Sequence, residues 1–336
     1  MLLFNMSMIK AKKIVFINIR GGLGNQLFCY FVGEFLNSAF KAQVKYLYNS
    51  KSNAHDNANS KISSLNLESE IIDTKSFKFY FIVFKLILRA LIKNNTKFIN
   101  KLSIQNFKSN VLFDEIYDEK FLGFEKESEA IKTWLFNSKS RVYYLRGLFQ
   151  DFNYFDNQPQ KCLNLKDPSA WYRQFTEESS ITSPIILHVR LGDYLKENGN
   201  TLGVLSLEYY QSALNLLREK FPNNEVWVFS NQTAKAKILL MPIVDSRFKF
   251  MFEAENKDPA EVLLAMSKGR ALITSNSTFS LWSARIFNDL SSIVVPNPFF
   301  ENMPIYSESF LESCSKVNAK WLTQLEINKL SKTFIS

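Results

Sequence analysis

The sequence predicts an α/β fold made of two Rossmann-like units, each with a parallel sheet. Three observations carry this prediction. Short, β-branched apolar runs alternate with segments of helical apolar spacing, the pattern of parallel sheets with crossover helices. Glycine or small hydroxyl residues follow several of the runs, as they do where a strand turns into a helix. The chain has 336 residues, of which 46% are hydrophobic, which suits one large domain or two of medium size.

The first unit is predicted to open with a strand, a glycine-rich turn and a helix. Residues 14–19 form an apolar run, and residues 26–39 carry apolar side chains at helical spacing. Residues 44–47 and 141–145 are further strand candidates. The polar stretch 49–60 is expected to be a surface loop.

A second strand–loop–helix series follows residue 184. Its predicted strands are 185–189, 225–229, 271–274 and 293–295, and its helices are predicted to start with Ser206 as a cap, at Pro259 and within 275–280. We therefore predict four parts of the chain. They are a Rossmann-like domain at 1–160, a connection at 161–183, a second Rossmann-like domain at 184–310, and a tail at 311–336 that packs back.

The formal net charge of +9 favours an acidic partner. No helix-turn-helix, RNA-binding sheet motif or zinc finger occurs, so we expect no nucleic acid partner. A phosphorylated ligand and an anionic membrane surface remain, beside plain solubility. Residues 77–92 are predicted to form a helix with a basic, aromatic-rich face, which either packs on its own domain or lies on an anionic bilayer.

Cysteines and histidines limit the chemistry further. Cys29, Cys162 and Cys314 are far apart and odd in number, which argues against a disulfide framework and fits a reducing cytoplasm. With only His55 and His188, a multi-histidine metal centre is not expected. The N-terminus is atypical of a signal peptide, and no window offers the roughly 18 apolar residues of a spanning helix. We predict a cytoplasmic protein, at most peripheral on the inner face of the membrane.

A glycine-rich loop, Gly21-Gly22-Leu23-Gly24-Asn25-Gln26, joins the first strand to the first helix. Glycine permits close backbone approach, so N–H groups around Gly22 can bind a phosphate or a sugar. The loop lacks the lysine of a Walker A motif and the third glycine of the dinucleotide fingerprint. A tight turn would explain the glycines, whereas the amides of Asn25 and Gln26 suit hydroxyl recognition.

A second motif, His188-Val189-Arg190-Leu191-Gly192-Asp193-Tyr194, ends a predicted strand at the edge where open α/β sheets bind ligands. Arg190 can hold a pyrophosphate with two hydrogen bonds and needs no metal. Asp193 can accept a proton or order the loop. The alternative is a buried network of His188, Asp193 and Arg190 that only holds the loop.

A third motif, Ser275-Asn276-Ser277-Thr278-Phe279-Ser280-Leu281-Trp282, lies between a strand and a helix. Its small hydroxyl residues cap that helix, and they line the positive end of the helix dipole, which favours a phosphate. Capping alone is the alternative. No Asp-x-Asp pair occurs in the chain, so we predict that no divalent metal is required and that arginine and a helix end offset the charge of a leaving group.

Together, GGLGNQLF, HVRLGDY and SNSTFSLW, with LRGLFQDFNYF at 145–155, resemble the motif series of the alpha-1,2-fucosyltransferases of glycosyltransferase family 11. The resemblance runs from about Ile14 to Pro298. It implies a GT-B-type arrangement in which two Rossmann-like domains face a central cleft, the first toward a glycan acceptor and the second holding GDP-fucose. The implied reaction is an inverting, metal-independent transfer of fucose to the 2-hydroxyl of a terminal galactose-type sugar.

The resemblance also implies roles for individual residues. Arg190 would bind the donor pyrophosphate, and His188 would lie near the guanosine. Asn25 and Gln26 would lie near the reacting sugar. Glu261 stands at an acidic position that either contacts guanine or caps a helix. The nucleotide diphosphate would be cradled by the start of the third motif: Asn276, Ser277, Thr278, Phe279 and Ser280.

Two positions depart from the resemblance. Leu191 stands where the family usually has a second arginine, and Leu281 where it commonly has a second aromatic residue. Asp193 is the first candidate for the general base, and the first domain is the other source. A GDP-sugar transferase of different linkage and a nucleotide- or glycan-binding protein without turnover remain as alternatives, the second because of Leu191.

Overall fold

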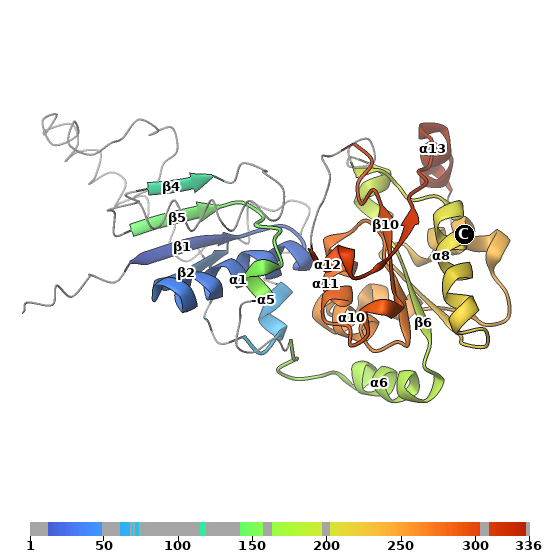
Figure 1. Ribbon diagram of the computed structural model, residues 1–336, viewed down its shortest axis with the longest axis horizontal. Helices are drawn as coiled ribbons and strands as arrows, with labels where there is room; N and C mark the ends of the chain where they lie inside the picture. Colours follow the sequence, from blue (N-terminus) through green and yellow to red (C-terminus); the bar gives the residue numbers. More distant parts are fainter. Residues whose placement is uncertain are drawn as a thin grey trace, which may run out of the picture.

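Two parallel sheets make up the computed structural model (Figure 1), which describes residues 13–48, 61–67, 69, 71–73, 115–118, 142–156, 163–196, 202–302 and 309–333. The predicted α/β class with two parallel sheets is confirmed. The predicted loop at 49–60 and the predicted helix at 77–92 lie outside the described residues.

The first sheet has five parallel strands in the order β3-β2-β1-β5-β4. They are β1 (Ile14–Ile19), β2 (Gln43–Tyr48), β3 (Ile71–Asp73), β4 (Glu115–Asp118) and β5 (Val142–Arg146). The central strand β1 alternates half-buried and buried residues, with Val15, Ile17 and Ile19 inside, because successive side chains of a strand point to opposite faces. The helical elements of this first unit are α1 (Leu23–Phe40), η1 (Lys61–Ser64) and α5 (Asn153–Asp156).

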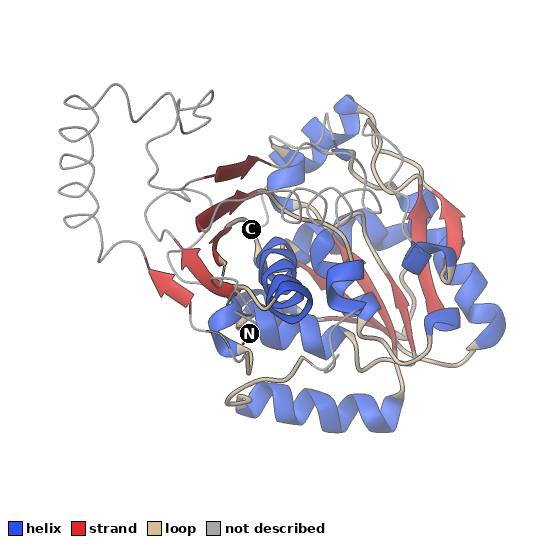
Figure 2. Ribbon diagram, turned by 60° about the vertical axis from the view of Figure 1, so that its left-hand side comes forward, coloured by secondary structure: helices blue, strands red, loops and turns tan. Residues whose placement is uncertain are grey.

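The second sheet has six parallel strands in the order β11-β10-β9-β6-β7-β8. They are β6 (Ile185–Val189), β7 (Val226–Ser230), β8 (Phe248–Phe250), β9 (Ala271–Ile273), β10 (Ile293–Asn297) and β11 (Ser315–Asn318). Helices pack around these strands (Figure 2). They are α6 (Ala170–Thr182), α8 (Leu207–Lys220), α9 (Thr233–Leu240), α10 (Pro259–Met266), α11 (Thr278–Arg285), α12 (Ser309–Glu312) and α13 (Gln324–Lys332), with 3-10 turns at η2 (Gly192–Leu195), η3 (Met241–Ile243), η4 (Phe252–Asn256) and η5 (Leu290–Ser292).

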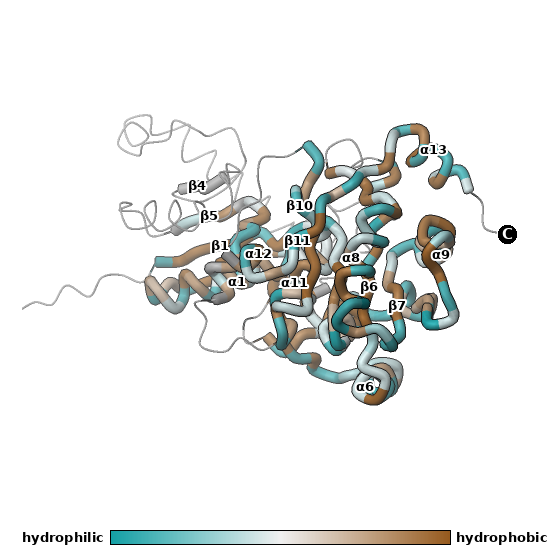
Figure 3. Tube along the Cα trace, turned by 45° about the vertical axis from the view of Figure 1, so that its right-hand side comes forward, coloured by the Kyte–Doolittle hydropathy of each residue, from teal (hydrophilic) through white to brown (hydrophobic). Residues whose placement is uncertain are grey.

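Strands β6 and β7 are buried along their whole length and appear as hydrophobic segments in Figure 3. Alternate residues enter different apolar clusters: Ile186 and Trp227 lie in one, and Leu187 and Val228 in the other. Such continuous apolar strands are typical of a parallel sheet that is covered on both faces.

One of these apolar clusters contains buried residues of both sheets. The ring of Trp282, on α11, lies 4.9 Å from that of Phe28, on α1, and 4.8 Å from that of Phe152, centroid to centroid. Phe31 and Phe155 complete the contacts at 5.3 and 5.2 Å. We call these five residues the aromatic seam. Because it belongs to a single apolar cluster, the two units share buried surface where α1 meets α11.

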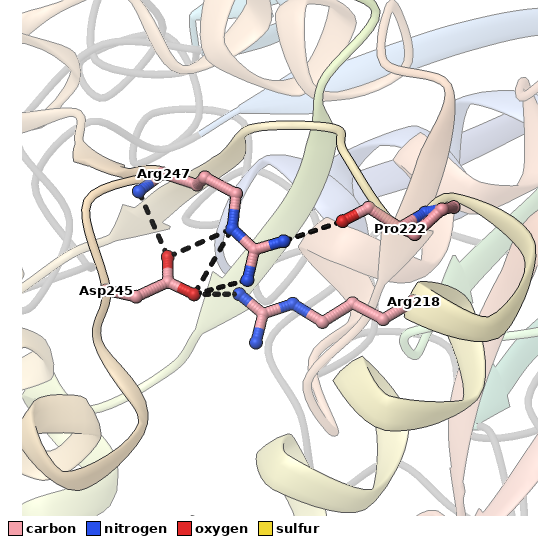
Figure 4. Close-up of polar contacts among 4 residues, drawn as sticks. All are labelled: Arg218, Pro222, Asp245 and Arg247. Atoms are coloured by element: carbon pink, nitrogen blue, oxygen red, sulfur yellow. Dashed lines mark hydrogen bonds and ion pairs between the residues drawn. The ribbon is translucent and has the colours of Figure 1, made fainter.

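A polar cluster fastens the edge strand β8 (Figure 4). Asp245, just before β8, lies 2.8 Å from Nη2 of Arg218 and 2.5 Å from Nη2 of Arg247. Arg247 also donates to the Pro222 carbonyl at 2.6 Å. The bonds to Arg247 are the main reason why the pKa of Asp245 falls to about 2. The cluster thus ties the end of α8 to the beginning of β8.

The structure differs from the predictions at several boundaries. Helix α1 begins at Leu23, because the glycine-rich loop already winds its first turn. Ser206 precedes α8 as predicted, but its hydroxyl donates to Glu208 and makes no side-chain cap. The segment 161–183, predicted as a connection, holds α6, and the predicted tail supplies β11 to the second sheet. The predicted domain limits themselves stay predictions.

Candidate active site

Three loops at the carboxyl ends of strands carry the three motifs. They follow β1, β6 and β9. The first and third motifs touch where α1 and α11 begin. A Cβ atom added at Gly24 would lie 2.7 Å from the carbonyl carbon of Thr278. A side chain at position 24 would therefore collide with backbone, and glycine is required there. The carboxyl-end loops of the two sheets meet at this point.

Asn25 makes the polar link at the same place. Its Oδ1 accepts hydrogen bonds from Nε2 of Gln150 at 2.8 Å and from Oγ1 of Thr278 at 3.2 Å. Gly21 has a φ of +76°, in the left-handed region, and Gly22 precedes the first residue of α1 in an extended conformation. The strand therefore turns sharply, and the first turn of α1 places the Asn25 side chain against the second unit.

Gln26 faces the protein interior. Its side chain is fully buried, its Nε2 donates to the Gly21 carbonyl at 2.9 Å, and its Oε1 accepts from the N–H of Ile62 at 3.3 Å. Both ends of the amide are thus bonded to the backbone. Gln26 shapes the glycine-rich loop and ties it to η1, and its predicted place near a sugar remains a prediction.

His188, the last-but-one residue of β6, is buried as well. Its Nδ1 lies 2.8 Å from Oγ of Ser275, the second residue after β9. Burial, with a smaller contribution from Arg190, lowers the pKa of His188 to about 3, so the imidazole is neutral at physiological pH. Its ring lies 5.9 Å from that of Phe279. His188 therefore joins the second motif to the third.

Arg190 follows the end of β6 and stays partly exposed. Its Nη2 lies 2.6 Å from Oδ1 of Asp193, and its Cζ lies 5.5 Å from the ring centroid of Tyr194. The Tyr194 hydroxyl donates to the Asn276 carbonyl at 2.9 Å. The exposed fractions of the two side chains are 27% for Arg190 and 44% for Asp193, so the pair is not buried. The guanidinium is restrained by the carboxylate and the ring, and part of it can reach an anion.

Leu191 is fully buried in the apolar cluster that includes Val189 and Tyr194. Its N–H donates to Oδ1 of Asn231 at 3.0 Å. Gly192 has a φ of +32°, and a Cβ atom there would lie 2.1 Å from Nδ2 of Asn231. The residue that replaces the family's usual second arginine therefore anchors the loop by apolar burial, with Asn231 packed against its backbone.

Hydrogen bonds within the third motif and to residues outside it hold this segment in place. Asn276 donates to the carbonyls of Leu202 and Gly203 at 2.8 and 3.0 Å, and Ser277 caps α11 by accepting from the N–H of Phe279. Ser280 donates back within the motif to the Ser275 and Ser277 carbonyls. Thr278 and Phe279 are the partly exposed members. Phosphate contacts of this segment would therefore come from these two residues and from backbone N–H groups at the start of α11.

Glu261 lies in the first turn of α10 with only 5% of its surface exposed. Its Oε1 accepts from the N–H of Ser169 at 2.6 Å, and its Oε2 accepts from the Ser169 hydroxyl at 2.7 Å. Ser169 is the N-cap of α6, whereas Asp258 caps α10. In this structure Glu261 therefore supports the start of a neighbouring helix, and guanine would have to displace that contact.

Two residues of the site were not identified from the sequence. Gln150 contacts Asn25, and Asn231 holds the loop of Arg190. Each follows a parallel strand, Gln150 after β5 and Asn231 directly after β7, which is a signal for both. Gln150 also lies within the segment 145–155 that contributes to the resemblance. Leu281 is fully buried, which accounts for an apolar residue at that position.

The described part of the chain offers no group of three or more histidine, cysteine, aspartate or glutamate side chains that could hold a metal ion. Among the helices of that part, none has both the length and the apolarity needed to cross a bilayer.

Two parallel sheets whose carboxyl-end motifs meet, with a partly exposed arginine after β6, match the GT-B-type arrangement that the resemblance implies. The chain belongs to glycosyltransferase family 11: the family model "Glycosyl transferase family 11" matches residues 14–321. The resemblance noted in the sequence is thereby confirmed.

The chain is also similar to individual relatives and solved structures. An alpha-1,2-colitosyltransferase of Escherichia coli is 26% identical over 300 residues, covering 88% of this chain and 95% of the relative. The O-antigen biosynthesis glycosyltransferase WbnK of Escherichia coli is 24% identical over 299 residues, covering 84% and 93%. Among solved structures, the NodZ alpha-1,6-fucosyltransferase co-crystallized with GDP has a TM-score of 0.46 and 11% identity, covering 82% of this chain and 93% of that one.

Proposed function

We propose that the chain transfers L-fucose from GDP-fucose to the 2-hydroxyl of a terminal galactose-type sugar in a glycan, with inversion and without a divalent metal. The observation that carries this proposal is the partly exposed guanidinium of Arg190 at the end of β6, in the loop that contacts the third motif. An accessible arginine and a helix start are the groups that bind a diphosphate in the absence of a metal.

These groups would act on the charge of the leaving GDP. When the bond between the sugar and GDP breaks, negative charge develops on the β-phosphate, and a fixed cation stabilises it more in the transition state than in the ground state. Arg190 supplies the cation. The N–H group of Gly22 in the first unit and the residues 276–280, through Thr278, Phe279 and backbone N–H groups, would complete the phosphate contacts. The neutral His188 would lie near the guanosine, with Glu261 as a further candidate for guanine.

The acceptor hydroxyl must lose its proton as the new bond forms. Asp193 is our candidate for the general base because its carboxylate is exposed beside Arg190. The same ion pair gives it a second task, which is to orient the guanidinium. Asn25 and Gln26 would serve the reacting sugar, Asn25 directly and Gln26 through the shape of its loop.

The names of the relatives support the proposed alpha-1,2 linkage and a surface polysaccharide as the product. One relative carries an alpha-1,2 linkage in its name, and the other is named for O-antigen biosynthesis. We therefore propose a bacterial surface polysaccharide precursor, lipid-linked or free, as the acceptor and the cytoplasm as the place of reaction, without a nucleic acid partner. Transfer of colitose is a second candidate, favoured by the 26% identical colitosyltransferase.

A donor screen tests this proposal. The purified chain is incubated in EDTA with a panel of galactosides and with GDP-fucose, GDP-colitose, GDP-mannose or UDP-galactose, and products are followed by mass spectrometry. We expect a deoxyhexosyl product from GDP-fucose, and a product from GDP-colitose alone would favour the second candidate. Activity that appears only after Mg²⁺ or Mn²⁺ is added would contradict the metal-independent reaction. GDP binding without cleavage of any donor would favour a binding protein.

A further inference from the structure

We propose that Gln150 and Asn25 together bind one hydroxyl of a reacting sugar, so that Gln150 helps to determine which sugar is used. This inference rests on the proposed function and adds a residue that neither the motifs nor the relatives assign. It starts from the hydrogen bond between Nε2 of Gln150 and Oδ1 of Asn25, which joins two loops 125 residues apart in the sequence.

The bonds that the two amides make determine what they can still offer. Oδ1 of Asn25 accepts from both Gln150 and Thr278, and among the described residues these are the hydrogen bonds of the Asn25 side chain. The Asn25 amide nitrogen therefore keeps its donors, and Oε1 of Gln150 keeps its acceptor capacity. Both side chains are partly exposed. A donor next to an acceptor matches a sugar hydroxyl, which can accept one hydrogen bond and donate another.

The backbone holds Gln150 in a defined position. Phe149 before it is fully buried with a φ of +50°, which is unusual for a residue other than glycine. The N–H of Asp151 donates to the Phe149 carbonyl at 2.8 Å, so Gln150 is the middle residue of a three-residue turn. Phe152 then enters the aromatic seam. Buried aromatic residues on both sides therefore fix the amide before any ligand arrives, which lowers the entropy lost on binding.

The position of the pair indicates which hydroxyls can reach it. Thr278 begins α11, where the donor diphosphate is proposed, and Asn25 lies in the first turn of α1 of the first unit. A hydroxyl bound between Asn25 and Gln150 is therefore carried either by the transferred sugar or by the acceptor sugar next to it. Deoxygenated analogues of each sugar distinguish these two sources.

The test compares Gln150→Met, which keeps the length of the side chain, with Gln174→Met, an exposed glutamine on α6. We expect both variants to melt near wild type and to bind GDP within about twofold of it, because Arg190 and the start of α11 are unchanged. We expect Gln150→Met to lower kcat/KM for transfer about five- to tenfold or more, as the loss of one neutral hydrogen bond predicts, and Gln174→Met to leave it unchanged.

Deoxy analogues provide the decisive readout. For wild type, removal of the contacted hydroxyl should cost about five- to tenfold in kcat/KM, and in Gln150→Met the same removal should cost only about twofold, because the bond to Gln150 is already lost and the bond to Asn25 alone remains. The sugar whose penalty falls in the variant carries the hydroxyl. Equal penalties in wild type and variant for every donor and acceptor analogue would overturn the inference while leaving the proposed function intact.

A second variant keeps the test open if Gln150→Met fails to fold. Gln150→Asn keeps the polar amide but is one methylene shorter and cannot reach Asn25 and the hydroxyl together, so we expect a normal melt, reduced transfer and a weakened penalty for the same analogue. An unchanged penalty would contradict the inference. A wild-type chain that cleaves no GDP-sugar would overturn the proposed function, and the inference with it.

Discussion

Arg190 is the single residue on which the proposed chemistry depends most. Its guanidinium is restrained by Asp193 at 2.6 Å and by the Tyr194 ring, yet remains partly exposed. The neighbouring position holds the buried Leu191, so no adjacent side chain can replace the charge. The bidentate geometry of a guanidinium also differs from the point charge of a lysine.

Replacement of this arginine should therefore separate activity from folding. We expect Arg190→Ala to lower the rate of transfer by about 10²–10³-fold and Arg190→Lys to be poor as well. The melting temperature should stay close to wild type, because a partly exposed ion pair contributes little to stability. Steady-state kinetics and thermal melts check this, with Arg173→Ala on α6, an exposed arginine, as the control. Near-normal transfer by Arg190→Ala would show that the charge comes from elsewhere, and a collapsed melt would support a purely structural network.

Single residues also show which contacts the sequence does not predict. Asn25 and Gln26 are adjacent amides with the same expected role, but the helix turns one toward the second unit and the other into the core. Gln150 takes the place beside Asn25 although 125 residues separate them. No local pattern reports such a contact, because it depends on how β5 and α1 are placed in the folded sheet.

At the scale of elements, predictability followed length and periodicity. The strands at 14–19 and 185–189 and the helices after 206 and at 259 appeared where the apolar pattern indicated, since their apolar runs or helical spacings are regular. The short edge strands β3, β8 and β11 have three or four residues of mixed polarity, and they are strands because a neighbouring strand offers hydrogen-bonding partners.

The polar cluster at β8 gives a prediction with a defined pH dependence. Because the folded-state pKa of Asp245 is about 2, below the usual value of about 4 for aspartate, its ion pairs stabilise the fold above pH 4 and lose that effect as the pH falls toward 2. We expect Asp245→Asn to melt about 1–4 °C below wild type at pH 7, a small effect because the carboxylate is about one-third exposed.

Thermal melts between pH 7 and the lowest pH at which both proteins fold measure this difference. It should shrink below pH 4, whereas Glu219→Gln, an exposed carboxylate next to Arg218 on α8, should melt like wild type throughout. An Asp245→Asn deficit that is absent at pH 7, or that persists unchanged into acid, would contradict the role given to the cluster.

At the scale of the whole molecule, the two-sheet architecture was predictable and the contact between the units was not. Alternating strands and helices indicated two parallel sheets, because that pattern has few other solutions. The aromatic seam unites Phe28, Phe152 and Trp282 from distant parts of the chain, and their separate motifs showed only that each was aromatic. The seam brings the glycine-rich loop against α11 and so places motif residues of both units side by side.

The most direct measurement is the structure of the product. The chain is incubated in EDTA with GDP-fucose and the galactoside that the donor screen identifies, and the isolated product is analysed by NMR for anomeric configuration and linkage. We predict an alpha-configured fucose on the 2-hydroxyl of galactose, formed with inversion of the beta-linked donor. A fucose attached at another hydroxyl, a product with retained configuration, or no product without added metal would contradict the proposed reaction.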